Sequence, residues 1–347
     1  MTVTTPTHPD APEQGVGARR RCLTADMAGD PVGAAPAGAA PLIDAHGLTK
    51  RYGDFTLSGI DVTVNPGDIV GFIGQNGAGK TTTIKTLLGL VTPQSGTGTV
   101  LGTPLGQMSR QAGNAVKERI GVVLDTIGFP VAMRVDAIAS LMPHCYADWD
   151  APMFDRMLRE SGIDGRKTVQ SLSRGMGMKM SLAVALSHHP TLLILDEATA
   201  GLDPMARDDM LGLLRRFVDD GEHGVLMSSH ITSDLDRIAD RVICIDGGRM
   251  VFDESKDTIT DIRGIARCRE RDLAAIASSG RYRPGELRAI RHDYGIDVAV
   301  PDRFAFAKHL PGIPVDRMTI DDYMHFMLKG GRLMVEEDRS AGKGDPR

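Results

Sequence analysis

At residues 74–81 the sequence reads Gly74-Gln75-Asn76-Gly77-Ala78-Gly79-Lys80-Thr81. This stretch fits the phosphate-binding template G-x-x-x-x-G-K-[ST]. The apolar run from Ile69 to Ile73 comes directly before it and predicts a buried strand, and the segment from Thr82 to Leu90 is compatible with a helix. Strand, glycine-rich loop and helix follow one another in the order that this template needs.

The residue types of the loop suit a polyphosphate. Glycines let successive backbone N–H groups turn inward, and the N-terminus of the following helix adds positive potential. Lys80 is expected to reach the outer phosphates, and the Thr81 hydroxyl to be a ligand of Mg²⁺. A glycine-rich loop without phosphate function is the alternative. The sequence predicts a nucleoside triphosphate site, with these binding residues: Gly74, Gln75, Asn76, Gly77, Ala78, Gly79, Lys80, Thr81 and Thr82.

The composition is that of an ordinary globular protein. The 347 residues are 41% hydrophobic and 24% charged, which is enough for a sizeable core and two domains. A net charge of −5 gives no electrostatic reason for general nucleic-acid binding. Nucleic acid is therefore not the expected partner.

Cysteine usage and hydropathy bear on the compartment. The four cysteines, Cys22, Cys145, Cys244 and Cys268, lack metal-ligand or disulfide spacing and suit a reducing compartment. No apolar stretch approaches the ~20 residues that cross a bilayer, and the N-terminus lacks the apolar region of a secretory signal. We expect a cytoplasmic protein that reaches a membrane through a partner.

Composition divides the chain into four segments. Residues 1–40 are rich in Ala, Gly, Pro and Thr and predict a disordered tail. Residues 41–256 carry the nucleotide-binding pattern, and their signals turn helical over about 116–187. Residues 257–330 introduce new elements and predict a small α+β appendage, followed by a flexible tail over 331–347.

Three further apolar runs predict the core of the nucleotide-binding segment. They span 192–195, 225–227 and 242–245, and helical stretches separate them. Short apolar runs of this kind are typical of parallel strands that are buried on both faces. The predicted fold class is therefore α/β.

Two acids, Asp196 and Glu197, follow the run Leu192-Leu193-Ile194-Leu195. Open α/β sheets place their ligand sites at the carboxyl ends of the strands. Asp196 suits the Mg²⁺ shell, directly or through water, and Glu197 can polarise the water that attacks a γ-phosphate. Acids also occur by chance at strand ends, but the phosphate loop upstream favours the functional interpretation.

Between the loop and these acids the sequence reads Leu172-Ser173-Arg174-Gly175-Met176 and opens a predicted helix over 178–187, whose N-terminus is a further anion site. Here the chain resembles the ATP-binding cassette (ABC) ATPases, whose signature begins Leu-Ser-Gly-Gly. The resemblance covers roughly residues 42–252 and rests on three motifs in order. It implies a P-loop core with an antiparallel β subdomain and a helical subdomain.

The resemblance also implies a division of roles at the site. Tyr52 would stack on adenine, His230 would be the switch histidine at the γ-phosphate, and Asp203 the D-loop acid at a dimer seam. Two cassettes of this family enclose two ATP molecules with Mg²⁺, so Ser173 and the Gly175 N–H would complete the γ-phosphate site of the partner. Each residue also has an ordinary interpretation: a strand-surface aromatic, a loop histidine and a helix start.

The chain departs from the family pattern at two positions. Asp125 follows the run Ile120-Gly121-Val122-Val123-Leu124, where the family usually has glutamine, and would bind nucleotide and metal differently. Arg174 replaces a glycine of the signature and adds bulk and positive charge beside the phosphates of the partner. Hydrolysis is still expected, because Glu197 and His230 are both present.

The resemblance favours an ATP-hydrolysing subunit that dimerises with an identical or paralogous cassette and drives a separately encoded permease. The chain is similar to ATPase subunits of bacterial drug and antimicrobial-peptide exporters, and this similarity implies a location at the inner face of the cell membrane. Two alternatives stay open: a soluble ABC ATPase acting on ribosomes or DNA, and a regulatory cassette with weak hydrolysis. The sequence does not identify the transported molecule or the role of either tail and the appendage.

Overall fold

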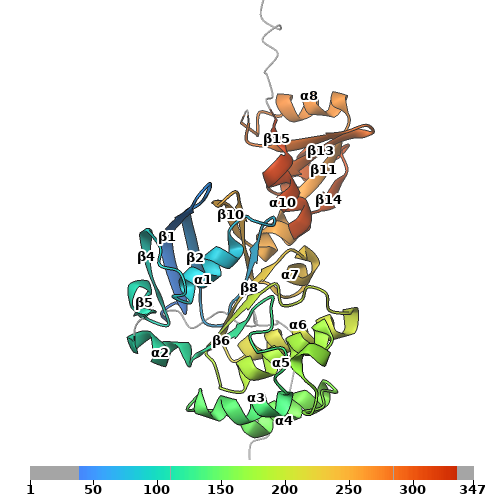
Figure 1. The fold of residues 1–347 in the computed structure, drawn as a ribbon. Helices are drawn as coiled ribbons and strands as arrows, with labels where there is room; N and C mark the ends of the chain where they lie inside the picture. The colour runs from blue at the N-terminus through green and yellow to red at the C-terminus, as the bar shows by residue number, and fades with distance from the viewer. Residues whose placement is uncertain (1–38, 110, 284, 334–347) are drawn as a thin grey trace, which may run out of the picture. The chain divides into compact units, whose positions relative to one another are not determined.

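The computed structural model describes residues 39–109, 111–283 and 285–333, which belong to one compact unit. These residues form three sheets of four, six and five strands, with helices packed around them (Figure 1). The predicted tails fall almost wholly on residues 1–38 and 334–347, outside the described residues.

The six-stranded sheet is the centre of the nucleotide-binding segment. Its strand order is β10-β9-β3-β8-β7-β6, and all neighbours are parallel except β10, which pairs with β9 in the antiparallel sense. The strands are β3 (Ile69–Ile73), β6 (Ile120–Val123), β7 (Leu192–Asp196), β8 (Gly224–Ser229), β9 (Arg241–Asp246) and β10 (Arg249–Ser255).

The central strands form because their sequences are almost continuously apolar. Every residue of β3, β7 and β8 is buried, as expected when helices cover both faces of a parallel sheet. The strands predicted from the apolar runs are confirmed, and so is the α/β fold class. Helix α1 (Lys80–Leu87) begins two residues before the predicted start, since Gly79 at its N-cap adopts the left-handed φ of 112°.

A four-stranded antiparallel sheet, in the order β2-β1-β4-β5, covers the start of α1. Its strands are β1 (Ile43–Tyr52), β2 (Phe55–Val64), β4 (Ser95–Val100) and β5 (Thr103–Pro104). Ile60, Val62 and Val64 alternate along β2 and are fully buried, so this face of the sheet packs into the core. A short 3₁₀ turn (Leu105–Gln107) and α2 (Gln111–Lys117) connect this sheet to β6.

The segment predicted to be helical contains α3 (Val135–Leu141), α4 (Ala151–Glu160) and α5 (Arg174–Leu186). These helices have a core of their own, to which Ile138, Phe154 and Met180 contribute fully buried side chains. The range 116–187 also contains β6, which pairs with β7 in the central sheet. The helical part therefore starts after β6. Helices α6 (Pro204–Val218) and α7 (Thr232–Ile238) are the remaining helices of the nucleotide-binding segment.

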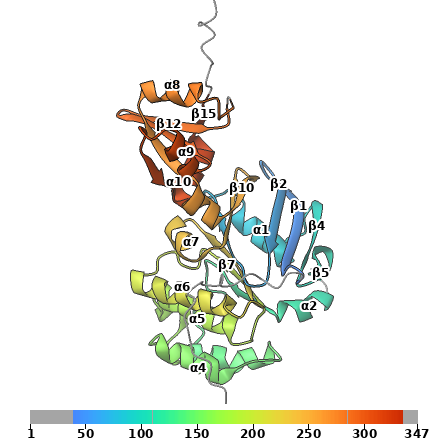
Figure 2. The ribbon, with the colours of Figure 1, turned by 180° about the vertical axis from the view of Figure 1, so that it is seen from behind.

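The C-terminal segment is a five-stranded antiparallel sheet with three helices (Figure 2). Its elements are β11 (Gly264–Cys268), α8 (Glu270–Ser278), β12 (Arg288–His292), β13 (Gly295–Val300), α9 (Arg303–His309), β14 (Val315–Arg317), α10 (Ile320–Lys329) and β15 (Gly331–Arg332). A π-helical turn, Thr258–Ile262, links it to β10. Ile265 and Tyr323 belong to the same hydrophobic core as Leu235 of α7, and the boundary near residue 257 stays a prediction.

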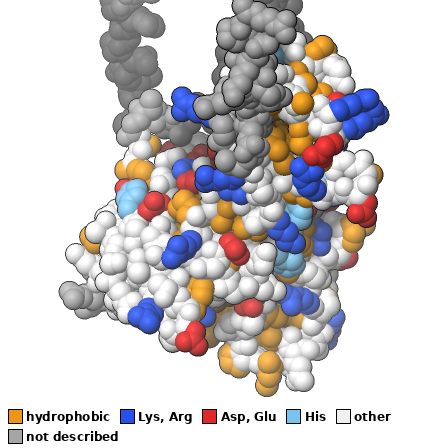
Figure 3. All heavy atoms as spheres, turned by 90° about the horizontal axis from the view of Figure 1, so that it is seen from above, with side chains coloured by type: hydrophobic (Ala, Val, Ile, Leu, Met, Phe, Trp, Pro, Cys, Tyr) orange, Lys and Arg blue, Asp and Glu red, His pale blue; other side chains and the backbone are white. Residues whose placement is uncertain are grey.

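Charges of both signs are interspersed on the face seen in Figure 3.

Across residues 39–109, 111–283 and 285–333, no helix combines the length and apolar character that a bilayer span requires.

Gly71 in β3 provides a test of how α7 packs on the central sheet. A Cβ at this position would lie 2.7 Å from Leu235 Cδ1, whereas a Cβ at Gly106 would meet nothing within 4 Å. We expect Gly71→Ala to lower the free energy of unfolding by about 1–3 kcal/mol, the cost of overpacking a core. Gly106→Ala should change it by less than about 0.5 kcal/mol. Urea denaturation of both variants measures this difference, and equal effects would contradict it.

Candidate nucleotide-binding site

The parallel register brings three segments of the chain to one edge of the central sheet. Ile73 of β3 is paired with Ser229 of β8, and Ser228 is paired with Asp196 of β7. The residues that follow these strands therefore emerge side by side at the carboxyl ends, where open α/β sheets bind their ligands. The phosphate loop, the two acids and His230 meet there for this reason.

Close packing determines where the phosphate loop needs glycine. A Cβ at Gly74 would lie 2.2 Å from the carbonyl oxygen of Ile245, and one at Gly79 would lie 2.7 Å from Leu57 Cδ1. A side chain at either position would force the loop away from β9 or β2. The loop backbone is held by hydrogen bonds from the Ala78 N–H to Gln75 O (3.1 Å) and from the Gly248 N–H to Ala78 O (3.1 Å).

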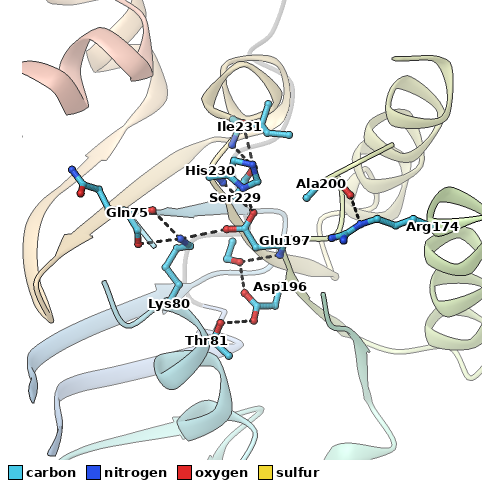
Figure 4. Close-up of polar contacts among 12 residues, drawn as sticks. Gln75, Lys80, Thr81, Arg174, Asp196, Glu197, Ala200, Ser229, His230 and Ile231 are labelled. Carbon is cyan, nitrogen blue, oxygen red and sulfur yellow. Dashed lines mark hydrogen bonds and ion pairs between the residues drawn. The ribbon is translucent and has the colours of Figure 1, made fainter. Parts of the chain in front are cut away.

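Lys80 points back into the phosphate loop. Its Nζ donates to the carbonyl oxygen of Gly74 at 2.8 Å and lies 3.3 Å from Glu197 Oε1 (Figure 4). The Lys80 side chain is only 7% exposed, so these partners offset the cost of burying its charge. The ammonium group is held where a polyphosphate inside the loop would meet it.

Asp196 links the phosphate loop to β8. Its two carboxylate oxygens accept hydrogen bonds from Thr81 Oγ1 at 2.8 Å and from Ser228 Oγ at 2.5 Å (Figure 4). Asp196 is 1% exposed, and both oxygens are satisfied. These contacts place the Thr81 hydroxyl and the Asp196 carboxylate next to each other at the start of α1.

Glu197 has an unusual backbone conformation. Its φ is +53°, in the left-handed region that costs a non-glycine residue about 1–2 kcal/mol. The Glu197 N–H donates to Ser228 O at 3.2 Å and Ser228 Oγ at 3.1 Å, which helps to maintain this conformation. Its carboxylate then contacts Lys80 on one side and His230 Nδ1, at 2.5 Å, on the other (Figure 4).

Hard oxygen donors are available for a divalent cation. Mg²⁺ prefers one or two protein oxygens together with water and substrate phosphates, and the Thr81 hydroxyl and the Asp196 carboxylate fit that preference. Within the described residues, no cluster of three or more His, Cys, Asp or Glu is arranged to hold a metal by itself. Asp125, the third predicted ligand, lies two residues beyond β6 with an exposed side chain.

Tyr52 ends β1 and is 44% exposed. It pairs with Phe55, whose ring lies 3.1 Å from the position of a Cβ at Gly79. The β1–β2 hairpin therefore passes directly beside the phosphate loop. Lys50 Nζ lies 5.6 Å from the centroid of the Tyr52 ring. An exposed aromatic ring is thus available next to the loop.

Arg174 of the signature lies apart from the Lys80–Glu197–His230 group (Figure 4), and Ser173 and Gly175 are its neighbours at the start of α5. Ser173 is the N-cap of α5, and its Oγ accepts from the Met176 N–H at 3.2 Å. Arg174 Nε donates to the carbonyl oxygen of Ala200 at 2.9 Å. The sequence suggested that this guanidinium lies beside a partner's phosphates. That expectation stays a prediction, and within this chain the Arg174–Ala200 contact ties the signature to the segment that leads to Asp203.

Asp203 is the N-cap of α6, as the ordinary interpretation of the Asp-Pro pair expected. Its Oδ1 accepts from the Ala206 N–H at 3.0 Å, and Pro204 follows as the first helical residue. The Asp203 side chain is exposed. It therefore caps a helix and also faces solvent.

Sequence reasoning missed two contributors to the site. Ser228 contacts both acids, and its signal was a serine placed level with Asp196 on the neighbouring strand. Met324 of α10 lines a cavity of about 320 Å³ together with residues 74–76 of the phosphate loop, Ser229 and His230. No local pattern connects Met324 to the loop, because the two lie in different segments.

Comparison with known proteins agrees with this geometry. Residues 57–200 match the family model described as ABC transporter. The chain is 35% identical over 217 residues to the Nod factor export ATP-binding protein I of Burkholderia orbicola (strain AU 1054), covering 60% of this chain and 69% of that protein. It is 33% identical over 213 residues to the bacitracin transport ATP-binding protein BcrA of Bacillus licheniformis, covering 60% and 68%.

Solved structures show the same fold. The structure of an ATP binding subunit of an ABC transporter has a TM-score of 0.57 at 26% identity and covers 63% of this chain and 91% of that chain. A cassette of an ABC transporter in its ADP conformation, at 18% identity, has a TM-score of 0.54, covers 64% of this chain and 96% of its own, and supports the fold alone.

The fold and the strand-end site define a P-loop ATP-binding cassette. The chain belongs to the ABC transporter family. The resemblance expected from the phosphate loop, the signature and the Asp-Glu strand is confirmed.

Cys244 of β9 is paired with Ile73, the last residue of β3 before the phosphate loop. Its reactivity provides a chemical test of the packing of β9 on β3. Burial, followed by the charge of Asp246, raises the pKa of the Cys244 thiol to about 12. Only thiolates are alkylated rapidly, so at pH 8 this thiol stays protonated and unreactive. We expect iodoacetamide to modify the exposed Cys145 in the native protein and to spare Cys244, as peptide mass mapping would show.

The matched control is the same reaction in urea, where Cys244 should react as readily as Cys145. Alkylation of Cys244 at the rate of Cys145 in the native protein would contradict the packing of β9 on β3.

Proposed function

We propose that this protein is an ATP-binding and ATP-hydrolysing subunit of an ABC transporter, which dimerises around two MgATP molecules and drives a separately encoded permease. The contacts that join Thr81, Asp196, Glu197, Lys80 and His230 at one sheet edge carry this proposal. The name of one relative, an export ATP-binding protein, supports export as the direction. The proposed location is the cytoplasmic face of the membrane, through the permease.

The phosphate loop would bind the triphosphate of ATP. Backbone N–H groups from Gly74 to Thr82 would surround the phosphates, and the Lys80 ammonium would leave Glu197 to contact the outer phosphate oxygens. The exposed ring of Tyr52 would stack on adenine. Thr81 and Asp196 would hold Mg²⁺, with Asp125 as a further ligand, and the cation would neutralise charge on the phosphates.

Glu197 is the proposed general base. Its carboxylate lies between Lys80 and His230, so a phosphate that engages Lys80 would free the Glu197 oxygen to accept a proton from the attacking water. The imidazole of His230 holds the other carboxylate oxygen and would contact the γ-phosphate. These two residues are the proposed catalytic pair.

The second half of each site would come from the partner cassette. Ser173 and the Gly175 N–H start a helix of thirteen residues, whose N-terminus favours anions. Arg174 Nε donates to Ala200 O, and in the proposed dimer this contact would keep the guanidinium on its own subunit rather than between the signature and the phosphates. Asp203 is exposed beside this contact and would lie at the dimer seam.

Replacing Lys80 tests the phosphate-loop assignment. We expect Lys80→Ala to weaken ATP binding by about 10- to 100-fold, the range for losing hydrogen bonds to a charged group. The control is Lys85→Ala, which removes an exposed lysine from the same helix and should leave the affinity unchanged. Isothermal titration with ATP measures both, and equal affinities for the two variants would contradict the assignment.

Replacing Glu197 tests hydrolysis and dimerisation together. We expect Glu197→Gln to bind ATP, to lose turnover by about a hundredfold or more, and to accumulate a closed dimer. Glu160→Gln, at an exposed end of α4, is the matched control and should behave as the wild type. ATPase assays with and without Mg²⁺ across protein concentrations, together with light scattering, measure these effects.

Turnover that rises more than linearly with wild-type concentration would support a homodimer. Unchanged turnover in Glu197→Gln would remove Glu197 from its catalytic role. ATP binding without turnover in the wild type would favour the regulatory cassette, and repeated copurification with ribosomes would favour the soluble class.

A further inference from the structure

Helix α7 begins two residues after His230 and has little stability of its own. It has seven residues, and its N-cap, Ile231, provides no side-chain hydrogen bond. Isolated helices of this length are not stable in water, so tertiary packing determines where α7 lies. The position of His230 therefore depends on the elements that hold α7.

Helix α10 of the C-terminal segment holds one face of α7. Thr232 and Asp236 are four residues apart and lie on the same face of α7. Asp236 Oδ1 accepts from the Ile320 N–H at 3.0 Å, and Thr232 Oγ1 donates to Asp321 Oδ1 at 3.4 Å. The first turn of α10 thus provides partners at both ends of this face.

Apolar packing reinforces these hydrogen bonds. Leu235 and Ile238 of α7 belong to the same hydrophobic core as Ile320, Tyr323 and Phe326 of α10. These side chains are at most 6% exposed, and Leu235 also packs on Gly71 of β3, so moving either helix out of this core would expose apolar side chains. The two helices are expected to move as one body.

Met324 extends this support to the nucleotide site itself. Its half-buried side chain lines the cavity of about 320 Å³ that Gly74, Gln75, Asn76, Ser229 and His230 also line. A thioether has no charge to offer a phosphate, so its contribution there is packing. Met324 thus faces the same cavity as His230 and the phosphate loop.

We propose that α10 is a positioning element of the ATPase, in which Met324 holds the His230 segment against the phosphate loop and thereby sets the rate of turnover. The C-terminal segment would then be part of the hydrolytic apparatus of its own cassette. This inference rests on the proposed hydrolysis, and it concerns residues that neither bind ATP nor react.

Met327 provides a matched control for Met324. Both methionines lie on α10, are half-buried and pack against the same core, but Met327 lines a different cavity, with Arg288 and Tyr323. We expect Met324→Ala to lower kcat about tenfold, a loss typical of residues that support a reacting group, without changing ATP affinity. Met327→Ala should keep the wild-type kcat, and Met324→Leu, which conserves volume, should restore most of it.

Hydrogen–deuterium exchange provides a second measurement that does not depend on hydrolysis. Both variants are first compared by their melting temperatures, so that a difference in overall stability is accounted for. The amides of residues 229–238 should then exchange faster in Met324→Ala than in Met327→Ala. Equal kcat values together with equal exchange rates in the two variants would overturn the proposal. If the wild type shows no turnover, the proposed function fails, while the exchange comparison still decides the role of α10.

Discussion

The hydrogen-bonded register of β7, β8 and β3 is the constraint on which the site depends. It places Asp196 opposite Ser228 and Ile73 opposite Ser229, so three segments that are distant in sequence end at the same level. Because each strand is buried along its whole length, a shift by one residue would expose apolar side chains and leave backbone groups unpaired. The positions of Asp196 and Glu197 beside the phosphate loop follow from this pairing, and the packed loop then places Thr81 against Asp196.

The contact between the buried Lys80 ammonium and the half-buried Glu197 carboxylate is a second constraint on the site. Removing an ammonium and a carboxylate from water is costly, and their mutual contact offsets part of the cost. A polyphosphate competes with Glu197 for the same ammonium. The two acids at the end of β7 differ in their partners. Asp196 accepts hydrogen bonds from two neutral hydroxyl groups, whereas Glu197 contacts the Lys80 ammonium and the His230 imidazole.

Local patterns predicted most of the cassette. The apolar runs predicted β3, β7, β8 and β9, and the glycine-rich loop predicted that a helix follows it, because the residues that form these features are adjacent in sequence. The start of α1 was placed two residues too late. Features that depend on register or on distant segments were not predictable. The role of Ser228 needs the pairing of β7 with β8, and the contact of Met324 needs the packing of α10 on α7. Arg174 illustrates the same limit, since its partner is a backbone carbonyl that no pattern marks.

The left-handed backbone of Glu197 and the contacts of its carboxylate have opposite effects on stability at a single residue. Glycine would adopt this φ without cost, and its introduction would relieve the steric energy stored at the end of β7. It would also remove the carboxylate that contacts Lys80 and His230. The buried Lys80 ammonium would then lack its carboxylate, a loss of about 3–5 kcal/mol in buried pairs, which exceeds the relief of about 1–2 kcal/mol in the backbone. Selection for resistance to heat alone would therefore retain Glu197, and the unfavourable backbone would be kept together with the carboxylate that it presents to the site.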